Sequence, residues 1–210
     1  HIVATQGNYE EAKLLFESSL AIDEKVLGPD HPSVAKALSN LAGLLRRQSK
    51  TEEAKPLLER SLAIWHKILW PDHPHVATAL NNLAGLLQDQ VRVNLLVVLN
   101  SNVLQLMQGN YEEAKALYTH SLGIHEKVLG PDHPELATSL TNLAGLLKRQ
   151  SNYGEAKVVY KRSLGIREKA LGPDHPNVAT DLNNLAGLVQ IQGNYEEARR
   201  LYQRSLAIRE

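Results

Sequence analysis

The stretch GPDHPNVATDLNNLAGLVQIQGNYEEARRLYQRSLAIRE, residues 172–210, decides the fold because the rest of the chain repeats it. Its Pro-Asp-His-Pro phrase begins at Pro29, Pro71, Pro131 and Pro173, so the successive steps are 42, 60 and 42 residues. A fixed period of this length is typical of a solenoid, in which small structural repeats stack on one another.

Within one repeat the apolar residues have helical spacing. Leu182, Leu185, Ala186 and Val189 follow one another at three- and four-residue intervals, which places them on one face of a first helix. A second helix carries a similar face, formed by Tyr195, Ala198, Leu201, Tyr202 and Leu206. Neither helix can bury its apolar face alone, so we expect neighbouring repeats to stack.

The punctuation between the helices agrees with this assignment. Pro176 can occupy the first helical turn without losing a hydrogen bond, and Gly193 can adopt the left-handed conformation that ends the first helix. Each repeat is therefore predicted to be two helices joined by short turns.

This repeat resembles the tetratricopeptide repeat (TPR), which has a period of about 34 residues. The residues that carry the resemblance are Leu185, Ala186, Gly193, Tyr195, Ala198 and Tyr202. The longer period of 42 residues is similar to that of the kinesin light chains and the nephrocystin-3-type proteins, over nearly all of residues 7–210. The resemblance implies an all-α, right-handed TPR superhelix of antiparallel helix pairs.

One array is expected to span residues 1–210. It comprises a partial repeat at 1–27, complete repeats at 32–69, 74–129 and 134–171, and a repeat at 176–210 that we expect to be truncated. We number the last four ranges as repeats 1 to 4. The partial repeat opens with the tail of a first helix, so the chain is expected to be part of a longer array.

The long step comes from an insertion at about residues 91–108, inside repeat 2. Eighteen residues correspond to about five helical turns, so a helix could continue through it and keep its apolar side. Three interpretations stay open: a helix packed locally beside the solenoid, an extension that exchanges helices with a second copy of the chain, or a substitute first helix.

The composition excludes several classes of protein. Lys and Arg number 23, as do Asp and Glu, so nothing favours a nucleic-acid or membrane-surface role. Cysteine is absent, which excludes disulfides and suits an intracellular setting. No signal peptide and no apolar run of about 18 residues is visible. We expect a soluble, cytoplasmic protein.

No catalytic motif emerges. His31, His73, His133 and His175 belong to different repeats, about 10 Å apart if stacked, too far to share a metal ion. The paired glutamates open second helices, where negative charge favours the helix dipole. Phosphate-binding glycine loops and nucleophile motifs are absent. We therefore expect neither an enzyme, nor a cofactor, nor a metal site.

A peptide-binding groove is the expected site. Asparagine recurs directly before the Leu-Ala-Gly phrase, at Asn40, Asn82, Asn142 and Asn184. In related TPR proteins the asparagine at this place hydrogen-bonds the backbone of an extended peptide, and the resemblance implies the same here. A carboxamide can donate to and accept from a peptide unit. Alternatively, these asparagines only satisfy neighbouring loops or helices.

Positions that vary between repeats on the same helix face would set specificity. They include Lys36, Arg46, Arg47, Asn81, Thr141, Lys148, Arg149 and Asn183. The basic residues in repeats 1 and 3 favour a ligand with acidic residues or a carboxylate. Alternatively, they are solvated charges that the helix dipole favours at helix C-termini.

The function predicted from the sequence is a protein-protein interaction scaffold that binds an extended peptide segment of a partner in its concave groove. The alternative is a structural module that associates through the insertion and uncapped end faces, with a homodimer formed through residues 91–108 as one form. No nucleic-acid or membrane partner is expected.

Overall fold

The computed structural model describes residues 9–94 and 101–210, and within these ranges every regular element is an α-helix. The chain forms two compact units, an N-terminal unit of residues 1–117 and a C-terminal unit of residues 118–210. The boundary between them lies within one long helix. The all-α fold expected from the sequence is confirmed.

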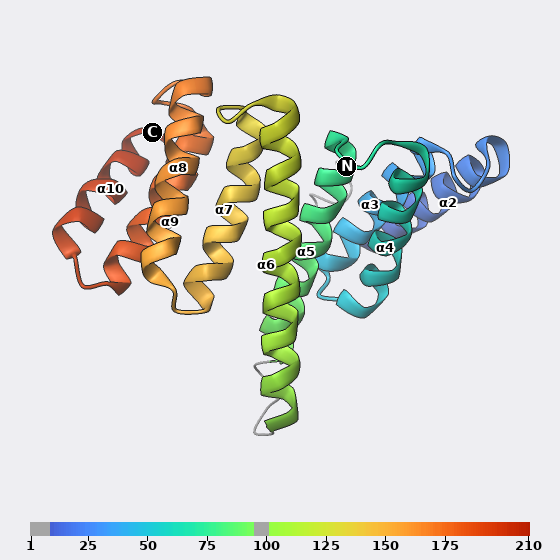
Figure 1. The fold of residues 1–210 in the computed structure, drawn as a ribbon, viewed down its shortest axis with the longest axis horizontal. Helices are drawn as coiled ribbons and strands as arrows, with labels where there is room; N and C mark the ends of the chain where they lie inside the picture. Colours follow the sequence, from blue (N-terminus) through green and yellow to red (C-terminus); the bar gives the residue numbers. More distant parts are fainter. Residues whose placement is uncertain (1–8, 95–100) are drawn as a thin grey trace. The chain divides into compact units, whose positions relative to one another are not determined.

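The helices follow the expected order (Figure 1). The N-terminal unit contains α2 (Tyr9–Leu27), α3 (Pro32–Arg47), α4 (Thr51–Ile68), α5 (Pro74–Asn94) and the first part of α6 (Ser101–Leu129). The C-terminal unit contains the rest of α6, α7 (Pro134–Arg149), α8 (Tyr153–Leu171), α9 (Pro176–Ile191) and α10 (Tyr195–Ala207). From α2 to α5, and again from α7 to α10, each helix packs on the next one in sequence, as stacked helix pairs require.

The histidines of the Pro-Asp-His-Pro turns cap the first helices. Nδ1 of His31, His133 and His175 accepts a hydrogen bond from the backbone N–H two residues ahead, at 3.2, 3.3 and 3.1 Å. The proline that follows occupies the first helical turn, where its missing N–H costs no hydrogen bond. This cap satisfies one of the unpaired donors at the helix start.

A buried serine joins the two helices of a repeat. Ser61, Ser163 and Ser205 each donate to the carbonyl oxygen of an alanine 26 residues earlier, at 2.7, 2.9 and 2.7 Å. All three serines are almost fully buried. An unpaired buried hydroxyl would destabilise the fold, so this hydrogen bond is what makes serine acceptable in the core.

The insertion is described at both of its ends. Helix α5 continues to Asn94, and α6 begins at Ser101 and runs without interruption to Leu129. A substitute first helix, one of the three interpretations of the insertion, would require a turn near Gly109, at the repeat position of Gly193. Gly193 has a φ of 80°, whereas Gly109 lies inside α6 and lacks a positive φ. A turn that would make residues 101–108 a separate first helix is therefore not observed.

Some of the sequence predictions fall on residues outside the described ranges. The tail of a first helix, expected at residues 1–6, is one of them, and the middle of the insertion, residues 95–100, is another. The local and helix-exchanging interpretations of the insertion stay open.

The two glycines at the same repeat position should respond oppositely to alanine. Gly109→Ala should raise the free energy of unfolding by about 0.5–1 kcal/mol, because glycine inside a helix loses more backbone entropy than alanine. A Cβ there would meet no atom within 4 Å. Gly193→Ala should lower it by about 1 kcal/mol, because an L-residue resists positive φ.

Urea unfolding followed by circular dichroism measures both changes. Each variant serves as the control for the other, since the same side chain is added at the same repeat position. Changes of the same sign would contradict the helical assignment of Gly109.

Candidate functional site

Three of the predicted groove residues meet in one pocket of the N-terminal unit. Lys36 and Asn40 reach it from α3, and Asn82 reaches it from α5. The pocket has a volume of about 260 Å³. The other residues that line it are Ser39, Trp65, His75, Thr78 and Ala79.

One wall of this pocket is aromatic. Trp65 comes from α4 and is 5% exposed, and its ring centroid lies 4.7 Å from that of His75. Ser39 lines the pocket, and its Oγ lies 2.9 Å from Oγ of Ser61. Ser61 is the buried serine whose hydrogen bond joins α4 to α3. The pocket therefore combines a rigid apolar wall with amide, hydroxyl and ammonium groups.

The other basic residues of the predicted groove differ in exposure and in whether an acidic side chain pairs with them. Arg46 Nε lies 2.7 Å from Asp89 Oδ2, so an acidic side chain of α5 offsets its charge. Arg47 and Arg149 are exposed at the ends of α3 and α7. Lys148 is half-buried, and its Nζ lies 3.5 Å from the position that a Cβ on Gly187 would occupy. The Lys148 side chain therefore covers part of the surface of α9 at Gly187, where there is no side chain.

The remaining predicted residues lie elsewhere. Asn81 is half-buried on α5, and Asn183 is exposed on α9. Asn142 and Asn184 are half-buried on α7 and α9 of the C-terminal unit. A binding role for these four asparagines stays a prediction.

Thr141 belongs to an internal polar network of the C-terminal unit. Its Oγ1 donates to Asp181 Oδ1 at 3.0 Å, and Ser163 Oγ lies 2.8 Å from Asp181 Oδ2, with its one hydrogen shared between this carboxylate and the Ala137 carbonyl oxygen. Arg167 Nη1 completes the network with a 2.5 Å contact to Asp181 Oδ1. Asp181 itself is fully buried. Thr141 therefore holds α7 to α9, a role that the sequence analysis did not foresee.

Burial raises the pKa of the Asp181 carboxyl above its ordinary value of 3.8. The charge of Arg167 and the hydroxyl groups of Ser163 and Thr141 act in the opposite direction. A buried carboxylate needs such partners, because removal from water disfavours its charged form.

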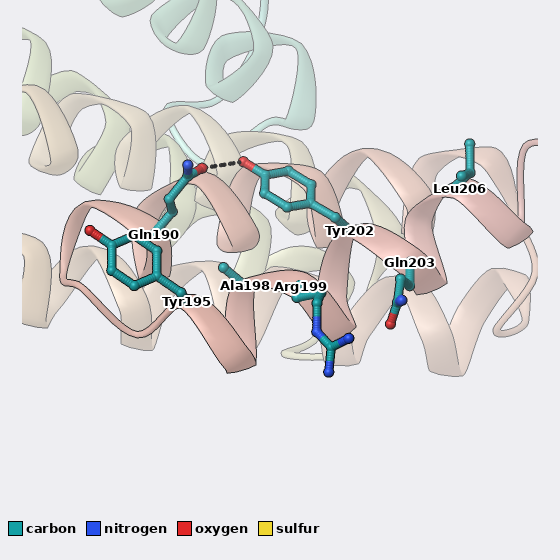
Figure 2. Close-up of a pocket in the computed structure, with 7 residues that line it drawn as sticks. All are labelled: Gln190, Tyr195, Ala198, Arg199, Tyr202, Gln203 and Leu206. Carbon is teal, nitrogen blue, oxygen red and sulfur yellow. Dashed lines mark hydrogen bonds between the residues drawn. The ribbon is translucent and has the colours of Figure 1, made fainter.

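The second pocket lies at the C-terminal end of the same unit, outside the predicted groove (Figure 2). It has a volume of about 340 Å³ and lies mainly on α10, with Tyr195, Tyr202 and Leu206 as its large side chains. Tyr202 donates a hydrogen bond to Gln190 Oε1 at 3.1 Å. In the preceding repeat, Tyr160 stands at the position of Tyr202 and is only 4% exposed. This pocket therefore lies on the stacking face of α10, the face that corresponds to the buried side of α8 at Tyr160.

Sequence reasoning missed Trp65, His75 and Ala79. One signal for Trp65 was present: its repeat position is filled by Asp23, Trp65, His125, Arg167 and Arg209. A buried position that changes from aromatic to charged between repeats indicates a change in local environment.

The tetratricopeptide repeat model matches residues 1–65, 33–91, 95–169 and 146–210, which together span most of the chain. The chain belongs to the tetratricopeptide repeat family. No curated protein matches it. TPR arrays are in general non-enzymatic scaffolds.

Solved structures agree with this membership. The chain is similar to BtubC (BKLC) from P. vanneervenii, with 23% identity, a TM-score of 0.75, and coverage of 99% of this chain and 75% of that one. It is also similar to a putative kinesin light chain of Podosopora anserina with nearly identical TPR-like repeats. There the identity is 27%, the TM-score 0.71, and the coverage 99% and 90%. The kinesin-light-chain type of TPR inferred from the sequence is thus confirmed.

The described helices show neither a membrane span nor a metal site of three or more ligands. Among them, none is long and apolar enough to cross a membrane. Within the same part of the chain, no group of three or more His, Cys, Asp or Glu side chains could hold a metal ion.

The buried Asp181 should make stability depend on pH. Since its folded-state pKa is raised, its contribution is fully present below the ordinary value of 3.8 and is lost as pH rises through the raised value. The unfolding free energy of the wild type, minus that of Asp181→Asn, should therefore fall as pH rises above the ordinary pKa of 3.8.

Urea midpoints at several pH values measure this difference. Asp174→Asn is the matched control, because it removes an exposed carboxylate from the same unit. A difference that grows with pH would show that Arg167 and the hydroxyl groups outweigh burial.

Proposed function

We propose that this TPR array binds an extended segment of a partner protein along the exposed face of its first helices. TPR repeats mediate protein-protein interactions, and the kinesin-light-chain type of repeat found here is consistent with that role. The observation that carries the proposal is the pocket where Asn40 and Asn82 meet across α3 and α5. Their carboxamides can hydrogen-bond a peptide backbone whatever its side chains are.

Charge supports an acidic ligand for this groove. Lys36 and Arg47 are exposed on α3 of the N-terminal unit. Long-range attraction to such residues speeds association and favours partners of opposite charge, although each exposed charge adds little affinity. We accordingly propose a segment that contains Asp or Glu.

The asparagine pair tests this function. A peptide-display library selected on the wild-type array provides the probe, and fluorescence anisotropy measures its affinity. Asn40→Ala together with Asn82→Ala should weaken binding by about 10–30-fold, because two hydrogen bonds of about 1 kcal/mol each are lost. Helicity should stay unchanged.

Asn177→Ala is the matched control, because it removes an exposed asparagine side chain that does not line the pocket. The proposal fails if the wild type selects no peptide. It also fails if the double variant binds as tightly as the wild type does.

A second candidate function is association between copies of the chain. Tyr195 and Leu206 are 69% and 58% exposed on the stacking face of α10, and apolar patches of this kind tend to associate. The insertion at residues 91–108 is the other proposed contact, in which case a homodimer would form through exchanged helices.

Light scattering after gel filtration tests association. If the stacking face of α10 drives it, the wild type should have a mass that rises with concentration, and Leu206→Glu should restore the monomer mass. Gln203→Glu, which adds the same charge beside the same pocket, should have a smaller effect. A wild type that is monomeric at every concentration would exclude this function.

A further inference from the structure

The turn between the two helices of a repeat carries serine in some repeats and glycine in others. Repeats 1 and 3 have Ser49 and Ser151 at this position, and the corresponding residues elsewhere are Gly7, Gly109 and Gly193. The sequence Arg-Arg-Gln precedes Ser49, and Lys-Arg-Gln precedes Ser151. No basic residue stands two or three places before any of the glycines. The serine and the basic pair therefore occur together.

The backbone of this turn favours glycine. The φ angle is 60° at both Ser49 and Ser151, and 80° at Gly193. In all three turns the next backbone N–H donates to the carbonyl oxygen five residues earlier, at 3.0, 2.9 and 3.1 Å. A positive φ costs an L-residue free energy that glycine avoids. Because both serines are exposed, burial of the side chain does not offset this cost.

Both serines are accessible to an enzyme. They lie directly after the last turns of α3 and α7, and Arg47 and Arg149 beside them are exposed as well. The pair formed by Arg46 and Asp89 is partly exposed, so its release costs little. Helix ends of this kind open locally at low free energy. The segment before each serine can therefore become extended while the rest of the unit stays folded.

Two basic side chains shortly before a serine suit one class of enzyme. Basophilic protein kinases bind such side chains with carboxylates of the substrate cleft, through charge-assisted hydrogen bonds. The serine Oγ then attacks the γ-phosphorus of magnesium-bound ATP. The bond between Oγ and phosphorus forms as the bond from that phosphorus to ADP breaks, and the hydroxyl proton passes to a carboxylate base of the kinase.

We propose that Ser49 and Ser151 are phosphorylation sites for a kinase of this class, which recognises the basic pair before each of them. A phosphate adds a charge of about −1.5 to −2. At Ser49 this charge offsets that of the exposed Arg47. Phosphorylation of Ser49 therefore weakens binding of an acidic segment, a consequence that rests on the function proposed above.

Mass spectrometry of the full chain tests the modification. The probe is the catalytic subunit of the cyclic-AMP-dependent protein kinase with magnesium and ATP. The chain should gain two phosphoryl groups, located by fragmentation at Ser49 and Ser151. Arg47→Gln should slow phosphorylation of Ser49 about 10-fold, because a charged hydrogen bond to the kinase is lost, and should leave the rate at Ser151 unchanged.

Two comparisons show whether the folded turn is the substrate. Ser18 and Ser19 are exposed on α2 without a basic pair before them, so they should stay unmodified. A synthetic peptide of residues 43–54 should react at most about 10-fold faster than Ser49 of the folded chain, because only a helix end must open. Access through global unfolding would slow the folded chain about 1,000-fold or more.

The proposal is overturned if the folded chain gains no phosphate at these serines. A folded chain that reacts about 1,000-fold more slowly than the peptide, or equal modification of Ser18 and Ser19, also overturns it.

Fluorescence anisotropy with the display-selected peptide tests the consequence for binding. The phosphorylated wild type should bind the peptide about 3-fold more weakly than the untreated chain. Ser49→Ala treated with the same kinase is the matched control and should keep its affinity. If no peptide is selected, the proposed function fails, and mass spectrometry alone decides the modification. Equal binding by treated and untreated wild type overturns the effect of Ser49 phosphorylation on binding.

Discussion

Close approach between paired helices is the constraint on which the rest of this structure depends. The serine hydroxyl of a second helix reaches an alanine carbonyl of the first at 2.7 to 2.9 Å, a distance that only small residues at the contact permit. Ala54 and Ala156, in the first turns of α4 and α8, are likewise fully buried. Because this contact joins the two helices in repeats 1, 3 and 4, helices that are individually marginal become stable as a stack.

The helices could be predicted from the sequence because their boundaries are local. Pro32, Pro134 and Pro176 open helices one residue after a capping histidine, and the spacing of apolar residues sets the buried faces. The continuity of α6 could not be predicted in this way. Gly109 occupies the same repeat position as Gly193, but residues 101–108 before it are helical and belong to the same helix, α6.

The candidate site was partly predictable for the same reason. Asn40 and Asn82 recur at a fixed place in each repeat, so periodicity identifies them. Trp65 and Ala79 lie on different helices, and they matter because both line the same pocket. Thr141 shows the opposite error, since it occupies a groove position yet is bonded to the buried Asp181. Contacts of this kind depend on three-dimensional packing, which no single-repeat pattern contains.

The ion pair of the C-terminal unit has a consequence for how such arrays diverge. An ion pair like that of Arg167 and Asp181 requires two substitutions, on separate helices. The order in which they occur affects the stability of the intermediate protein. A carboxylate that appears first is stranded in the core, as Asp181 would be without Arg167. An arginine that appears first can extend its long side chain toward water until its partner arrives. Duplicated repeats therefore have a preferred mutational path, in which the cation precedes the anion.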